Sequence, residues 1–172
     1  HVSAMIDPLR ELIPTLTIRQ RLPQVEVAVD GDGRTALVFR HLVPLGPGDL
    51  DKLLAFGKEH GADIWLQPKG PESAAPVDPA LSESLGLRLP EFNVRIAFKP
   101  TDFTQVNHAL NETMVSRAVR LLRTGPEKRV IDFFCGLGNF TLPLARRSGR
   151  VVGIEGSEGL GERARAGAAA NG

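Results

Sequence analysis

Residues 130–141 constrain the fold of this chain more than any other segment. An apolar run typical of a strand leads into Gly136-x-Gly138, and the next apolar run ends in Glu155. A strand, a glycine turn, a helix and a second strand that ends in a carboxylate form the arrangement with which Rossmann-type sheets hold nucleoside cofactors. Glycine lets the backbone approach a ligand closely, and the carboxylate can accept hydrogen bonds from ribose hydroxyls. The segment therefore predicts an α/β fold with a cofactor site at this turn.

The same turn separates two classes of cofactor. Its sequence from Gly136 to Thr141, Gly-Leu-Gly-Asn-Phe-Thr, lacks the third glycine of the dinucleotide-binding pattern. This favours S-adenosylmethionine (SAM) over NAD. Two alternatives stay open: an NAD-dependent oxidoreductase domain, and a buried strand followed by a plain tight turn without a ligand.

Composition limits the remaining classes. The net charge of +1 and the pI of about 8.2 neither require nor exclude nucleic acid. No apolar run approaches the roughly 20 residues of a membrane span, so we expect no membrane contact. The single cysteine, Cys135, excludes an internal disulfide framework and a multi-cysteine metal site in this segment, and favours a reducing, cytoplasmic setting. Because the chain opens at His1 without a methionine, we expect a processed product or a fragment. Nothing implies a protein partner.

The periodicity of the chain predicts two domains. Residues 1–92 form a small α+β domain, and residues 93–172 form the beginning of a Rossmann-like domain. The first has a helix over 3–16, strands over 25–29, 34–41 and 62–67, a helix over 47–59 and a solvated loop over 68–84. A hairpin pairs 85–89 with 94–98. The second has helices over 107–123, 139–147 and 157–171 and strands over 129–134 and 150–155. Since doubly wound sheets usually have five or more strands, we expect that Gly172 is not the natural end.

Two motifs together resemble the RNA uracil-C5 methyltransferases. The first, Phe-Lys-Pro-Thr-Asp-Phe-Thr-Gln-Val-Asn, ends at Asn107 and is followed by Asn111. The second, Asp-Phe-Phe-Cys-Gly-Leu-Gly-Asn-Phe-Thr-Leu-Pro-Leu, begins at Asp132. The similarity is strong over residues 93–172 and weaker over 1–92, which resembles the small central domain of that family. It is greatest to the bacterial iron–sulfur branch that acts on 23S ribosomal RNA, with the transfer-RNA enzyme as a near relative.

The resemblance implies a set of SAM-binding residues. Gln105, Phe134, Asn139 and Glu155 fall on the family's cofactor positions. Other interpretations compete: Phe134 as a core side chain, Asn139 as a helix N-cap, and Glu155 as a solvated charge. Asp132 is a carboxylate in an apolar strand, so we expect it to accept hydrogen bonds from the glycine loop or to lie near the cofactor amine. Asn107 is an N-cap or a ligand contact.

The resemblance also implies a reaction whose reactive groups are missing here. Enzymes of this family add a cysteine thiolate to uracil C6 so that C5 attacks the methyl group of SAM, and a base then removes the C5 proton. Cys135 lies inside the cofactor turn and is not expected to be that nucleophile. The nucleophile, the base and the ligands of the family's 4Fe-4S cluster lie outside this segment. We therefore predict no catalytic residue and no metal ligand in this chain, and an inactive fragment.

Basic residues indicate where RNA would bind. Arg117, Arg120 and Arg123 recur along the predicted helix over 107–123, and a solvated helix face is the alternative. A second basic group lies in the first domain: Arg19, Arg21, Arg34, Arg40 and His41. With 5% aromatic residues, no stacking platform for bases is evident. A non-catalytic RNA-binding module is therefore a third interpretation of the chain.

Overall fold

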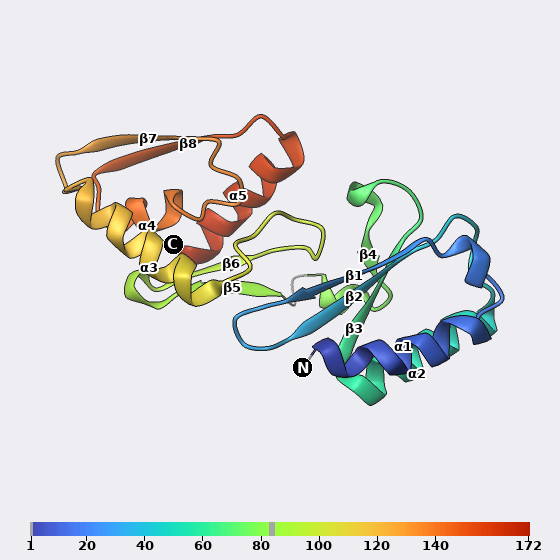
Figure 1. The fold of residues 1–172 in the computed structure, drawn as a ribbon. Coiled ribbons are helices and arrows are strands. Elements are labelled where there is room, and N and C mark those ends of the chain that lie inside the picture. Colours follow the sequence, from blue (N-terminus) through green and yellow to red (C-terminus); the bar gives the residue numbers. More distant parts are fainter. Residues whose placement is uncertain (1, 83–84) are drawn as a thin grey trace. The chain divides into compact units, whose positions relative to one another are not determined.

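The computed structural model describes residues 2–82 and 85–172. The chain divides into two compact units, each with its own sheets and helices (Figure 1). The first comprises residues 1–85 and 99–103, and the second comprises 86–98 and 104–172. The domain boundary that the sequence predicts after residue 92 stays a prediction; the division by contacts groups the hairpin after Leu85 with the second unit.

The first unit is a four-stranded sheet with helices from its own segment. β1 (Gln24–Val29) pairs antiparallel with β2 (Thr35–Arg40), and β2 pairs in parallel with β3 (Ala62–Gln67). β4 (Ala75–Pro76) adds an antiparallel edge to β3. The helices are α1 (Ile6–Leu12) and α2 (Pro47–His60). Five short 3-10 turns complete the unit: Val2–Met5, Ile13–Thr15, Arg19–Arg21, Pro71–Ser73 and Pro79–Leu81.

The core of the first unit lies between the sheet and its helices. Leu37 and Phe39 of β2, Leu53 of α2 and Ile64 of β3 are buried in one apolar cluster. Asp49, also buried, accepts hydrogen bonds from the backbone amide of Thr17 at 2.8 Å and from its hydroxyl. Burial alone would raise the pKa of Asp49, but the hydrogen bonds from Thr17 and Gly46 and the charge of Lys52 together hold that pKa below its usual range.

Two sequence expectations need correction in this unit. The predicted helix over 3–16 is an α-helix only from Ile6 to Leu12, with 3-10 turns on both sides. Pro14 has no backbone N–H to continue the α-helix. The predicted loop over 68–84 contains β4, whose two residues pair with Trp65 and Leu66. Residues 83 and 84 of that loop lie outside the described residues.

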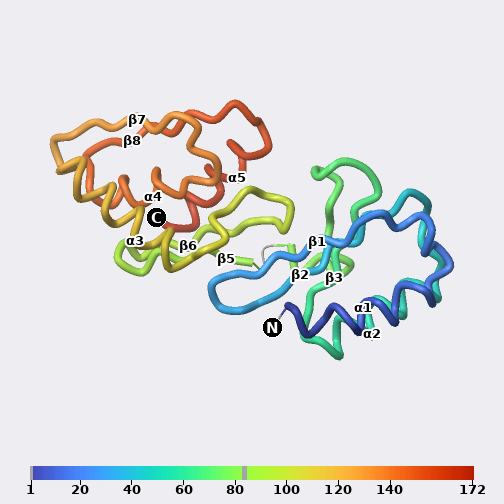
Figure 2. The backbone as a smooth tube through the Cα atoms, viewed as in Figure 1, coloured from blue at the N-terminus to red at the C-terminus, as the bar shows by residue number. Residues whose placement is uncertain are grey.

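The second unit contains a hairpin and a pair of parallel strands. β5 (Gly86–Leu89) and β6 (Val94–Ala97) are antiparallel, with a 3-10 turn at Pro90–Phe92 between them. β7 (Arg129–Phe133) and β8 (Arg150–Ile154) are parallel. The helices are α3 (His108–Leu121), α4 (Thr141–Ala145) and α5 (Glu158–Asn171). The chain leaves β7, passes through the glycine turn and α4, and returns as β8 beside β7 (Figure 2).

The three helices lie on one side of the β7–β8 pair (Figure 1). The strands alternate accordingly: Val130 and Val151 are half-buried towards the helices, whereas Ile131 and Phe133 are exposed on the opposite face. The predicted α/β fold class, with a Rossmann-like strand–turn–helix–strand unit, is therefore confirmed. No helix in the described part of the chain is long and apolar enough to span a membrane.

Candidate cofactor-binding site

The turn after β7 has an unusual backbone. Phe134, Gly136 and Gly138 have positive φ angles of 62°, 55° and 96°. Glycine adopts this region without penalty, whereas a residue with a Cβ does so at a cost of roughly 1–2 kcal/mol. At Gly138 a Cβ would also lie 3.1 Å from Cγ of Leu142. The two glycines are therefore required by the path of the turn, as the sequence predicts, while Phe134 holds a conformation that its side chain disfavours.

Backbone hydrogen bonds fix this turn to both strands and to α4. The amide of Cys135 donates to the carbonyl of Ile154 at 3.1 Å, which extends the pairing beyond β7. The amide of Gly138 donates to Cys135 at 2.9 Å, and Leu142 donates back to Gly138 at 3.0 Å, which begins α4. The turn is thus a defined structure before any ligand binds.

Glu155 joins the glycine turn to the end of β8. Its Oε2 accepts from the amide of Gly136 and its Oε1 accepts from the amide of Ser157, both at 2.9 Å. These bonds, from Ser157 first and Gly136 second, hold the pKa of Glu155 below its usual range. Each carboxylate oxygen has a further lone pair, so the ionised group can still accept hydrogen bonds from hydroxyls. The alternative of a merely solvated charge is wrong.

Asp132 is directed to the helix side of the sheet. Its Oδ2 accepts from the hydroxyl of Thr141 at 2.5 Å, and Gly153 lies opposite it on β8. This bond ties β7 to the first residue of α4. The donor is the first residue of α4 and not the glycine loop that the sequence suggested, and the role of Asp132 towards a cofactor stays a prediction.

Asn139 pairs with α3 and does not cap α4. Its Nδ2 donates to Asn111 at 2.8 Å, and Asn111 donates back to its Oδ1 at 2.9 Å. The N-cap of α4 is Phe140, without a side-chain bond, so the N-cap interpretation of Asn139 is wrong. Asn107 does cap α3, because its Oδ1 accepts from the amide of Leu110 at 3.0 Å.

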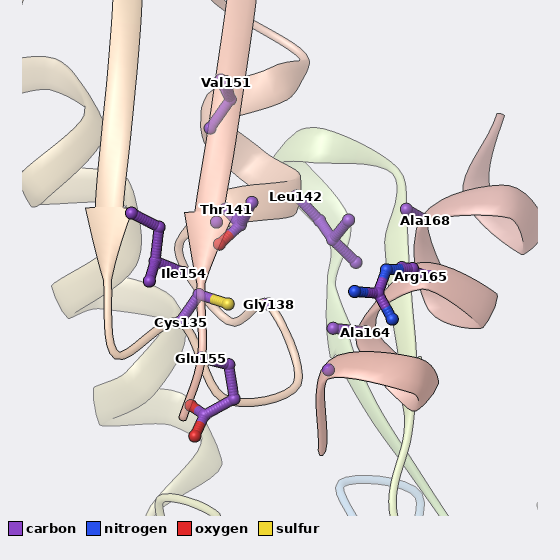
Figure 3. A pocket seen from close by; sticks show the side chains of 12 residues that line it. Cys135, Gly138, Thr141, Leu142, Val151, Ile154, Glu155, Ala164, Arg165 and Ala168 are labelled. Atoms are coloured by element: carbon purple, nitrogen blue, oxygen red, sulfur yellow. The ribbon is translucent and has the colours of Figure 1, made fainter. Parts of the chain in front are cut away.

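A cavity of about 420 Å³ lies beside the turn, between β8, α4 and α5 (Figure 3). This size is within the roughly 300–1,000 Å³ of small-molecule sites. Of the seven predicted site residues, Gly138 and Glu155 line it. Glu155 lies at one end, with its carboxylate turned away from Arg165 of α5, which lines the other side (Figure 3).

Gln105 and Phe134 lie outside this cavity. Gln105 is exposed in the segment before α3. Phe134 is 90% exposed and is not a core side chain, so that interpretation is wrong. The sequence analysis did not identify Thr141 and Asn111 as partners of Asp132 and Asn139. The signal for Thr141 was its place in the same motif, nine residues after Asp132. Asn111 accompanies the other motif of the resemblance, but its spacing does not show that it contacts the turn.

The thiol of Cys135 faces the helix side of the sheet and lines the cavity (Figure 3). Burial, followed by the nearby charge of Asp132, raises its pKa. A Cβ on Gly153 would lie only 2.9 Å from Sγ. Cys135 therefore lies against β8, and its raised pKa favours the protonated thiol over the thiolate. Across residues 2–82 and 85–172, no group of three or more His, Cys, Asp or Glu residues is placed to hold a metal ion.

The chain matches a protein family over its second half. A sequence profile of the family described as tRNA (Uracil-5-)-methyltransferase matches residues 81–172. Two relatives described as 23S rRNA (uracil(1939)-C(5))-methyltransferase RlmD, from Cupriavidus pinatubonensis and Bordetella avium, are 55% and 51% identical over 172 residues. The whole chain aligns with 37% and 36% of their lengths. It therefore spans little more than a third of these relatives.

Solved structures share the fold. The tRNA (uracil-54, C5)-methyltransferase of Pyrococcus abyssi, in complex with S-adenosyl-L-homocysteine, matches with a TM-score of 0.70 and 20% identity. The match covers 96% of this chain and 43% of that chain. TYW2 of P. horikoshii, in complex with MeSAdo, matches with a TM-score of 0.51 and 15% identity, over 96% of this chain and 59% of that chain.

Proposed function

Because the chain belongs to the tRNA (Uracil-5-)-methyltransferase family, we propose that its protein transfers a methyl group from SAM to C5 of a uridine in RNA. We propose 23S ribosomal RNA as the substrate, because relatives 55% identical over the full chain carry that description. Transfer RNA is the alternative substrate. Ribosomal RNA also implies a cytoplasmic site of action. The observation that carries the proposal is the bridge between Glu155 and the amide of Gly136.

The donors and acceptors at the turn fit SAM. Glu155 offers a carboxylate for the two ribose hydroxyls at the carboxyl end of β8, where open α/β sheets bind their ligands. Gly136 and Gly138 keep the turn free of side chains, so that the cofactor can approach the backbone. Phe134 projects its ring from the same turn, 90% exposed, and can contact the cofactor face. When bound, SAM supplies an electrophilic methyl group.

Three further residues are assigned roles at this site. Asn139 would contact the cofactor through its backbone, because its side-chain amide is hydrogen-bonded to Asn111. Asp132 holds Thr141 and thereby the start of α4. Gln105 precedes α3 and would close the site from the other side. These assignments, and the division into a central domain (1–92) and the first part of the SAM domain (93–172), are parts of the proposal.

This chain alone is proposed to be inactive. Addition to uracil C6 needs a thiolate, and a thiol is a poor nucleophile while protonated. Cys135 is the only cysteine, its pKa is raised, and its Sγ packs against Gly153. We assign the nucleophile, the base and the ligands of a 4Fe-4S cluster to the remaining two thirds of the protein.

Calorimetric titration of the chain tests this proposal. We expect saturable binding of SAM and no binding of NADH. Glu155→Gln, which cannot accept as a carboxylate, should weaken SAM affinity about tenfold, since charged hydrogen bonds contribute about 1.5–3 kcal/mol. Glu158→Gln, which makes the same change three residues later at the start of α5, is the matched control and should leave the affinity unchanged. Tighter binding of NADH, or equal SAM affinity in the two variants, would overturn the assignment.

A second assay addresses the inactivity. The chain is incubated with SAM and a uridine-containing fragment of ribosomal RNA, and nucleosides are separated after digestion. We expect no 5-methyluridine. Its formation would show that the reactive groups are present in this chain.

A further inference from the structure

A second cavity lies at the opposite end of the parallel strands from the glycine turn. Its volume is about 590 Å³, and it is formed by the ends of α3 and α4 and by the turns that lead into β7 and β8. Four arginines line it, together with a single carboxylate, Glu91. We call these four residues the arginine pocket: Arg120, Arg123, Arg146 and Arg147.

Backbone hydrogen bonds join the two turns that form the floor of the arginine pocket. The amide of Gly149 donates to the carbonyls of Gly125 at 3.3 Å and Lys128 at 3.1 Å, which locks the two turns together. A Cβ at position 149 would lie 1.8 Å from the carbonyl oxygen of Pro126. Only glycine therefore permits this close approach of the two turns.

Contacts within the second unit orient three of the four guanidinium groups. Nε of Arg120 donates to the carbonyl of Ser116 at 3.1 Å. Arg146 donates to the carbonyl of Gly172 at 3.1 Å and to that of Asn171. Arg147 lies over the ring of Phe92, 5.7 Å from its centroid. The contacts of Arg120 and Arg147 involve no opposite charge, so the charge of these two guanidinium groups remains available to a ligand.

The four arginines outnumber Glu91, the one acidic side chain among the described residues that line the pocket, so the pocket carries a net positive charge. Among the residues that the structure describes, none of the four arginines forms an ion pair with an Asp or Glu side chain. In addition, the buried Oγ of Ser148, which also lines the cavity, has no hydrogen-bond partner among the described residues. An anionic oxygen in the pocket would supply an acceptor for both kinds of donor.

Arg123 occupies a strained position. Its φ is 48°, just after the C-cap of α3, where glycine is the usual residue. An arginine here costs roughly 1–2 kcal/mol relative to glycine. Strain that is retained at one residue points to a role for its side chain, and this side chain lines the pocket.

We propose that the arginine pocket binds the phosphate backbone of the RNA substrate, away from the site of methyl transfer. The proposal rests on the proposed function, because that function makes RNA the polyanion that the protein meets. Guanidinium groups bind phosphate oxygens in bidentate fashion. No aromatic residue is among the described residues that line the pocket, and the ring of Phe92 lies beneath Arg147. The pocket therefore recognises phosphates and not bases, and its binding is independent of sequence.

The pocket also sets a minimum length of RNA. It is separated from the glycine turn by the length of β7, which has five residues. At about 3.3 Å per residue this is about 16 Å. An RNA that contacts both the pocket and the glycine turn must therefore span at least about 16 Å.

Fluorescence anisotropy with a labelled, uridine-containing RNA tests the inference on the whole chain. Arg120→Gln/Arg123→Gln removes two pocket charges. Arg117→Gln/Arg129→Gln is the matched control, because it removes two exposed charges that do not line the pocket. The pocket variant should bind about tenfold more weakly at low salt. Its plot of log affinity against log salt should be flatter by about 1.4, since each single-strand contact contributes about 0.7. Equal losses in both variants would overturn the proposal.

Two further measurements test whether weaker RNA binding reflects lost folding, and whether the ligand of the pocket is RNA or an acidic peptide. Arg123→Gly should unfold at a higher urea concentration than wild type, because the strain is relieved, yet bind RNA more weakly; unchanged RNA binding would contradict the proposal. Polyglutamate should compete poorly with RNA. Competition as effective as that of unlabelled RNA would show an acidic-peptide site instead. The same variants should bind SAM as tightly as the wild-type chain does. If the wild-type chain itself does not bind SAM, that result counts against the proposed function and not against the arginine pocket.

Discussion

Asn111 and Asn139 hold each other in a reciprocal pair of amide hydrogen bonds, 2.9 Å and 2.8 Å long. Asn111 lies on α3 and is 1% exposed, while Asn139 lies in the glycine turn. The pair thus joins the turn to a helix that precedes it by a whole strand. It also occupies the Asn139 side chain, so the turn presents its backbone, not that amide, to a ligand.

Removing one amide should loosen the turn. Asn111→Leu leaves the Asn139 amide without its partner, which should destabilise the chain by about 1–3 kcal/mol in urea unfolding. SAM affinity should fall in parallel, because the turn loses its support. The double variant Asn111→Leu/Asn139→Leu should recover part of the stability, since no unpaired amide remains. Additive losses in the double-mutant cycle would show that the two amides act independently.

Phe134 should lower the stability of the chain through its backbone conformation and raise its affinity for SAM through its exposed ring. Its φ of 62° disfavours any side chain, and its ring is 90% exposed. Phe134→Gly should therefore be about 1 kcal/mol more stable than Phe134→Ala, which keeps the backbone penalty. Both variants should bind SAM more weakly than wild type. Wild-type SAM affinity in either variant would remove Phe134 from the site.

The bridge from Glu155 should respond to acid in a defined direction. The pKa of Glu155 is lowered in the folded chain by the amides of Ser157 and Gly136. Its contribution is therefore present above the unfolded-state value of about 4.3 and is lost as pH falls through the lower folded-state value. The difference in unfolding free energy between wild type and Glu155→Gln should be constant near neutral pH. It should shrink only as the pH falls below the unfolded-state pKa of about 4.3. A difference that shrinks already between pH 7 and about 5, well above the glutamate range, would contradict the bridge.

Gly153 should not tolerate a side chain. Its Cβ would lie 2.9 Å from Sγ of Cys135 and 3.3 Å from Cγ2 of Thr141. Gly153→Ala should lower the unfolding free energy by about 1–3 kcal/mol through overpacking. Combining it with Cys135→Ala should restore part of that loss, because the nearest atom is removed. Absence of any rescue would place the strain elsewhere on β8.

A hydrogen bond in the first unit supplies a separate test of stability. The buried Asp49 at the start of α2 accepts from both the amide and the hydroxyl of Thr17. Thr17→Val removes the hydroxyl that donates to the buried Asp49 carboxylate, so the free energy of unfolding should fall by about 1–3 kcal/mol. Thr113→Val on α3, whose hydroxyl bonds to Ala109 at an exposed site, is the control and should cost less. Equal costs would mean that the Asp49 bond adds nothing beyond the loss of a hydroxyl.

The local elements of this fold were predictable because their signals are local. The strand-to-glycine pattern located β7, the turn and β8, and Ser157 marked the start of α5, where its hydroxyl accepts from Leu160 at 3.5 Å. β4 was missed because its two residues become a strand only through pairing with β3. The length of α1 was overestimated because its apolar period continues past the proline that interrupts the α-helix.

Contacts between distant segments could not be read from spacing. Asn139 reaches Asn111, 28 positions earlier, only once α3 lies against the turn. The arginine pocket likewise combines helix ends with turns that the fold brings together. By contrast, the place of Glu155 at the end of β8 could be predicted from the sequence, because the glycine turn, the helix and the strand follow one another directly along the chain.

A crystal structure of the chain with S-adenosylhomocysteine tests the central claim most directly. The account predicts both ribose hydroxyls within hydrogen-bond distance of the Glu155 carboxylate, with the bond from Gly136 retained and the nucleoside lying across the glycine turn. A nucleoside bound elsewhere, or a Glu155 side chain turned away from the ribose, would contradict it.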